Sequence, residues 1–108
     1  MTCEDTNPRR ITWEVQLYEP VSRVWMCEAY GRATTTAAPA DIAHAVLAGY
    51  LAHHPPRSTD TYRALARPDH GPAAIVRADQ LEDDGWTAGP DVRQALPVYL
   101  REALAAGT

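Results

Sequence analysis

The stretch from residue 11 to residue 18 reads Ile11-Thr12-Trp13-Glu14-Val15-Gln16-Leu17-Tyr18 and has the clearest pattern in this chain. Its apolar and polar side chains alternate almost without interruption, as side chains do when they project to opposite sides of a β-strand. The stretch therefore predicts a half-buried strand. We expect its odd-numbered side chains, with Trp13 among them, to lie in the core.

A second strand is predicted at Val24–Ala33, after a turn in which Pro20 favours the bend. The expected register pairs Tyr18 with Val24. It then places three apolar pairs on one face: Leu17 with Trp25, Val15 with Cys27, and Trp13 with Ala29. A shift by one residue would place Trp13 opposite Glu28 and exchange the two faces of the strand. This register predicts that Cys27 is a small buried apolar side chain.

A helix is predicted from Pro39 to about His54. Proline suits the first helical position, Asp41 suits the first turn, and Pro55-Pro56 ends the helix. One broad apolar stripe runs along it, formed by Ile42, Ala43, Val46, Leu47, Tyr50 and Leu51. This stripe predicts a helix that packs against the sheet.

The rest of the chain predicts a second hairpin and a second helix. The hairpin joins Tyr62–Arg67 to Pro72–Ala78 across the turn residues Pro68-Asp69-His70-Gly71. The helix follows from helical spacing of Val92, Ala95, Leu96, Tyr99, Leu100, Ala103 and Leu104. Asp91 and Gln94 resemble a capping box, and Pro97 is expected to kink this helix or to begin it.

These elements predict an α+β protein with the order ββαββα, in which an antiparallel sheet from two hairpins packs with two helices. We expect a polar N-terminal tail at residues 1–10 and a single domain at residues 11–108. A chain of 108 residues has the size of one domain.

The composition indicates an origin and a compartment. All ten basic residues are arginine, and phenylalanine is absent, which favours a GC-rich bacterial genome. Residues 1–5 contain two acids and no apolar run, and no stretch has the length of a membrane span, so a cytoplasmic protein is expected. Cys3 and Cys27 are then expected to be reduced. The net charge of −4 argues against nucleic acid as a partner.

Glu14 and Glu28 form the first candidate site, because the expected register places them directly opposite each other. Like charges that face each other in a sheet are unfavourable. Three interpretations stay open. The carboxylates are solvated or neutralised by Arg63, Arg67 or Arg77, they receive a basic group of a partner, or they are an acid–base pair with separated pKa values.

The same face carries the apolar residues Tyr18, Met26 and Tyr30, and also Val24. Either the C-terminal helix covers this face, or the face is an interaction surface. The second interpretation makes Glu14, Tyr18, Met26, Glu28 and Tyr30 the candidate interaction residues. A homodimer would bury them and bring the carboxylates near Arg32 of a second copy.

No motif in the sequence predicts catalytic, cofactor-binding or metal-binding residues. His44 and His53 fall on opposite sides of one helix, and the two serines lack a triad context. The leading prediction is therefore a cytosolic protein-interaction or regulatory module that forms a homodimer and binds an unknown protein partner, and an enzyme is the less favoured interpretation. The alternatives are a nucleic-acid-binding regulator and a small ligand-binding or enzyme fold whose site forms at the dimer.

Overall fold

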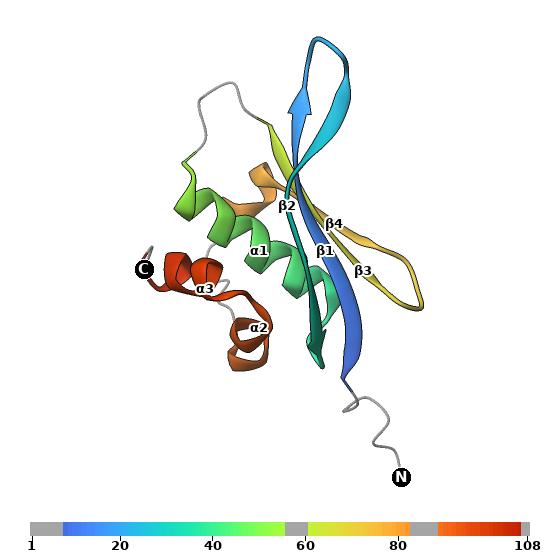
Figure 1. Ribbon diagram of the computed structural model, residues 1–108, viewed down its shortest axis with the longest axis vertical. Helices are drawn as coiled ribbons and strands as arrows, with labels where there is room; N and C mark the ends of the chain where they lie inside the picture. Colours follow the sequence, from blue (N-terminus) through green and yellow to red (C-terminus); the bar gives the residue numbers. More distant parts are fainter. Residues whose placement is uncertain (1–7, 56–60, 83–88, 107–108) are drawn as a thin grey trace.

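The computed structural model describes residues 8–55, 61–82 and 89–106 (Figure 1). Within these residues, four strands form an antiparallel sheet in the order β2-β1-β3-β4. The elements in chain order are β1 (Arg9–Glu19), β2 (Val24–Thr35), α1 (Pro39–His53), β3 (Tyr62–Pro68), β4 (Ala74–Arg77), the 3₁₀ helix η2 (Ala78–Glu82), α2 (Pro90–Ala95) and α3 (Val98–Ala106). The α+β class and the order ββαββα are confirmed, with the C-terminal helix divided in two. Strand β1 begins at Arg9, two residues before the predicted start. Cys3 and the connecting residues 56–60 and 83–88 lie outside the described residues.

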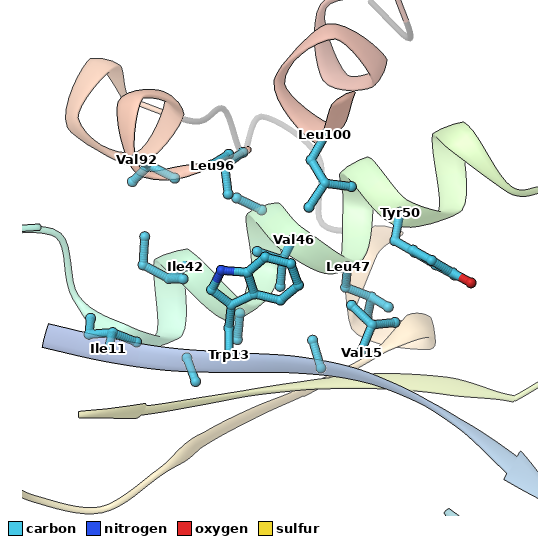
Figure 2. Close-up of a cluster of buried hydrophobic side chains, with 14 of the residues drawn as sticks. Ile11, Trp13, Val15, Ile42, Val46, Leu47, Tyr50, Val92, Leu96 and Leu100 are labelled. Atoms are coloured by element: carbon cyan, nitrogen blue, oxygen red, sulfur yellow. The ribbon is translucent and has the colours of Figure 1, made fainter. Parts of the chain in front are cut away.

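Strand β1 is the centre of the core, as its alternation predicts. Ile11, Trp13 and Val15 are at most 1% exposed. Figure 2 shows that they point toward α1. Their partners on β3 are Pro68, Ala66 and Ala64, and the two small alanines leave room for the indole ring of Trp13 and for α1 above the sheet.

Helix α1 is buried on two sides, because it lies between the sheet and the C-terminal helices (Figures 1 and 2). Its sheet side carries the predicted apolar stripe. Its other side carries Ala45 and Gly49, and a Cβ atom at residue 49 would lie 3.1 Å from the carbonyl oxygen of Leu100. The small residue at this position allows α3 to approach α1 closely. The molecule therefore has three layers, with α1 in the middle.

The C-terminal segment forms two helices because Leu96 adopts an extended conformation, with φ −88° and ψ 149°, before Pro97. Residues that precede proline disfavour the helical conformation. The predicted capping box is wrong. Gly89 is the N-cap, Pro90 takes the first helical position, and the Asp91 carboxylate accepts a hydrogen bond from the backbone N–H of Val92. Asp91 is thus the second residue of the helix and not its N-cap.

The predicted hairpin register is also wrong, because the turn is tighter and β2 contains a bulge. Glu19 pairs with Val24, and its carboxylate accepts hydrogen bonds from the backbone N–H and hydroxyl of Ser22. These bonds lower the pKa of Glu19. The pairing shifts by one residue between Val15 and Gln16, which leaves Glu28 unpaired. Such an extra residue exchanges the faces of the strand beyond it.

Candidate interaction surface

All helices among the described residues lie on one side of the sheet (Figure 1). The C-terminal helices pack on α1, so the alternative in which they cover the second face of the sheet is wrong. We call this second face the open face. The strand pairing places the following side chains on it: Arg10, Thr12, Glu14, Gln16, Tyr18, Trp25, Cys27, Tyr30, Arg32, Arg63, Leu65, Arg67, Ile75 and Arg77.

The open face consists of rows of neighbouring residues that cross the sheet. One row holds Arg32, Thr12 and Arg67; the next holds Tyr30, Glu14, Leu65 and Ile75; the third holds Cys27, Gln16, Arg63 and Arg77. Adjacent rows are about 7 Å apart, because they are separated by two residues along the strand. The middle row thus lies between two rows that each carry two arginines.

Charge is strongly segregated on this molecule. The open face holds five of the ten arginines of the chain, but Glu14 is its only acid among the paired strand residues. Arg10 has an acidic neighbour beyond the strand end, since its Nε lies 3.9 Å from a carboxylate oxygen of Asp69. A chain with a net charge of −4 therefore presents one positively charged face. Attraction of an anionic partner depends on this local positive charge and not on the net charge of the whole chain.

The middle row provides exposed apolar surface between the arginines. The side chain of Tyr30 is 78% exposed and that of Ile75 is 51% exposed. Aromatic rings bury a large area at little cost in conformational entropy when they enter an interface. This row therefore offers a contact surface that the sheet itself holds in place.

A network of side chains orients the charged groups of the third row. The guanidinium carbon of Arg63 lies 4.0 Å from the centre of the Trp25 ring, and the Nε of Arg63 donates a 2.7 Å hydrogen bond to Gln16. The amide nitrogen of Gln16 donates a 2.9 Å hydrogen bond to Glu14. Tyr18 packs beside Trp25 with ring centres 5.2 Å apart. Glu14 is thus linked to Arg63 through an amide rather than by a direct ion pair.

Cys27 lies on the open face, so its predicted burial is wrong. The bulge at Glu28 reverses the side to which it projects, and its thiol is free and exposed. Desolvation, together with the hydrogen bond and the negative charge of Glu14, raises the pKa of this thiol. The group is therefore protonated at neutral pH and is a weak nucleophile.

The structure divides the five candidate interaction residues between two surfaces. Glu14, Tyr18 and Tyr30 lie on the open face. Met26 pairs with Leu17 on the opposite side, and the carboxylate of Glu28 lies 3.4 Å from the hydroxyl of Tyr50 on α1. Glu14 and Glu28 are therefore not opposite each other.

Sequence reasoning missed Trp25, which it assigned to the buried face, and the joint location of Arg32 with the arginines of β3 and β4. No local signal marks the bulge that moves Trp25. The arginines of β3 could have been assigned, because Arg63 and Arg67 alternate with Ala64 and Ala66.

A second surface lies on the opposite side of the β1–β2 hairpin, whose tip projects beyond α1 (Figure 1). We call it the arm surface, and it consists of Leu17, Val24 and Met26 with Val21 in the turn. Val21 is 89% exposed, Met26 is 50% exposed and Val24 is 48% exposed. The outer edge of β2 has no strand partner among the described residues.

Tyr50 of α1 lies beside strand β2 of this hairpin, in a cluster of aromatic rings. Its ring centre is 5.1 Å from that of His54 and 5.9 Å from that of Tyr62. Burial and the negative charge of Glu28 raise the pKa of Tyr50 to about 12. The hydroxyl is therefore a hydrogen-bond donor to Glu28 at neutral pH.

The described residues contain no group of three or more histidine, cysteine or acidic side chains that could hold a metal ion. None of the helices in the described part of the chain has the length and apolarity needed to cross a membrane.

Comparison of this chain with protein-family models, curated proteins and solved structures finds no match.

Proposed function

We propose that this protein is a small interaction module that binds an anionic partner through the open face. One observation carries the proposal: two rows with two arginines each flank the row of an exposed tyrosine, on a sheet face that no described helix covers. Arginine binds carboxylate and phosphate groups through two parallel hydrogen bonds. Such a face attracts a negatively charged partner and holds it by short-range contacts.

The arrangement of the carboxylates supports binding over catalysis. An acid–base pair requires two carboxylates close enough to separate their pKa values. Glu14 and Glu28 project to opposite sides of the sheet, and Glu14 accepts a hydrogen bond from Gln16. This supports the interaction-module prediction over the enzyme alternative.

The proposal is tested by retention of the full chain on immobilised heparin, a general polyanion, in a salt gradient. The double variant Arg32→Gln/Arg67→Gln is expected to elute at clearly lower salt than the wild type. Arg93→Gln/Arg101→Gln, on α2 and α3, changes the net charge equally and is the matched control. If both variants lose retention equally, net charge and not the open face governs binding, and the proposal fails.

We propose homodimer formation as a second candidate function, supported by the exposure of the arm surface. Two copies that pair their β2 edges would bury Val24 and Met26 and extend the sheet. A stable contact would cover about 800 Å² per chain. A dimer through the open faces is disfavoured, because it would bring arginine rows against arginine rows.

Met26→Glu and Tyr30→Glu distinguish the two surfaces, because these residues project to opposite sides of β2. Sedimentation at micromolar concentration is expected to show a wild-type dimer, a Met26→Glu monomer and a Tyr30→Glu dimer. A wild-type monomer at every concentration would exclude homodimer formation. A dimer lost only in Tyr30→Glu would assign it to the open face.

A further inference from the structure

We propose that the anionic partner of the open face is single-stranded nucleic acid, whose bases stack on Tyr30 while its phosphates contact the arginine rows. This inference rests on the proposed function and names its partner. Tyr30 is the central residue, because it is 78% exposed and lies between Arg32 and the third row. Proteins that bind single strands combine a positive track with aromatic rings on which bases stack.

The spacing of the rows fits this partner. The row with Arg32 and Arg67 is about 13 Å from the row with Arg63 and Arg77, since four residues of a strand separate them. Tyr30, Leu65 and Ile75 fill the space between the two rows. A base on Tyr30 therefore has arginines on both sides to hold the phosphates that precede and follow it.

The shape of the face favours a single strand over a duplex. Bases in a duplex are stacked on each other and do not offer a free face to Tyr30. Duplex recognition uses a helix or a two-stranded ribbon that enters a groove. Every helix among the described residues lies on the other side of the sheet. The arginines are spread over β2, β3 and β4 and do not follow one projecting two-stranded ribbon, so this face is suited to contact unpaired bases directly.

An acidic peptide is the main competing partner. Its carboxylates would satisfy Arg67 and Arg77, but they provide nothing that stacks on an exposed ring. Nucleic acid uses both the charge and the aromatic surface of the face, whereas the peptide uses only the charge. The observations therefore favour nucleic acid, and the peptide is an arm of the test.

Glu14 allows a separate test of this inference, because it pairs with Tyr30 across β1 and β2 and carries the one negative charge among the paired strand residues of the open face. A negative charge at this position repels passing phosphates. Replacement of Glu14 by glutamine is therefore expected to increase affinity for an oligothymidylate.

The experiment measures fluorescence anisotropy of the full chain with three labelled probes: a dodecamer of thymidylate, a twelve-base-pair duplex and a dodecamer of glutamate. We expect the thymidylate to bind at least about tenfold more tightly than either competitor. Tyr30→Ala should weaken its binding by roughly 5- to 100-fold, the range expected for one lost stacking contact, and Tyr30→Trp should retain it. Tyr99→Ala, on α3, is the matched control and should bind like the wild type. Glu14→Gln should bind several-fold more tightly.

The outcomes separate this inference from the proposed function. Equal or tighter binding of the glutamate peptide or of the duplex overturns the inference and leaves the open face as a binding site for another polyanion. Binding that Tyr30→Ala does not change, in a variant shown to be folded by circular dichroism, also overturns it. Absence of binding to all three probes and to heparin overturns both proposals.

Discussion

The indole ring of Trp13 occupies the space that a side chain at Gly31 would need. The two residues face each other across β1 and β2, and a Cβ atom at residue 31 would lie 2.6 Å from Cζ2 of Trp13. Real Cβ atoms do not approach other atoms so closely. The absence of a side chain at residue 31 therefore allows β2 to pass beside the largest residue of the core.

Gly31→Ala is expected to destabilise the protein by about 1–3 kcal/mol, the usual cost of overpacking, although alanine is otherwise favoured over glycine in a strand. Chemical denaturation measures the change, and exposed Arg32→Ala is the control. Combination with Trp13→Phe should recover part of the loss, because the clashing atom belongs to the indole ring. A Gly31→Ala protein as stable as the wild type would contradict this packing.

Trp13→Ala is expected to lower the free energy of unfolding by about 3–5 kcal/mol, because it leaves a large cavity in the core. This loss is comparable with the total stability of a small domain, which is about 5–15 kcal/mol, so the variant should be largely unfolded near body temperature. Thermal unfolding followed by circular dichroism measures the effect. Trp25→Ala, on the open face, should lower the melting temperature much less. An unchanged melting temperature for Trp13→Ala would mean that the core face of β1 is assigned incorrectly.

Cys27 should react with a thiol reagent in the native protein, because its side chain lies on the open face. The measurement uses a Cys3→Ser background, so that only one thiol is present. Glu14→Gln should accelerate the reaction near neutral pH, since it removes a charge and a hydrogen bond that raise the pKa of the thiol. If the native thiol reacts only after unfolding, the bulge at Glu28 is excluded and the regular register is restored.

Tyr50 should make stability fall in alkaline solution. Its pKa is raised from 10 to about 12, first by burial and then by the charge of Glu28, so the folded state retains the phenolic proton longer than the unfolded state. The contribution of the protonated Tyr50 hydroxyl to the stability of the folded state is complete below pH 10. It is lost as the pH rises toward 12. Urea denaturation across this range should show a smaller decline for Tyr50→Phe than for the wild type. The same decline in both proteins would mean that Tyr50 ionises normally.

The elements could be predicted because each depends on neighbours in the sequence. The alternation around Trp13 identifies β1 and its buried side, and Pro39 and Pro55 bracket α1. The candidate site could be predicted only in part. Glu14, Tyr18 and Tyr30 share the open face, whereas Met26 and Glu28 project to the other side. Their assignment required an unbroken alternation along β2, and one additional residue is enough to reverse it.

The class of the fold, the order of its elements and the core face of β1 follow from the amino-acid sequence alone, because hydrophobic period, proline position and turn residues act over a few residues. Which face of the sheet stays uncovered depends instead on tertiary packing. The helix that contains Leu100 could have packed on either side of the sheet, and it packs on α1, where Gly49 allows close approach. The tertiary structure likewise placed Trp25 and the arginines of three strands on the open face, since strand pairing joins residues far apart in the chain.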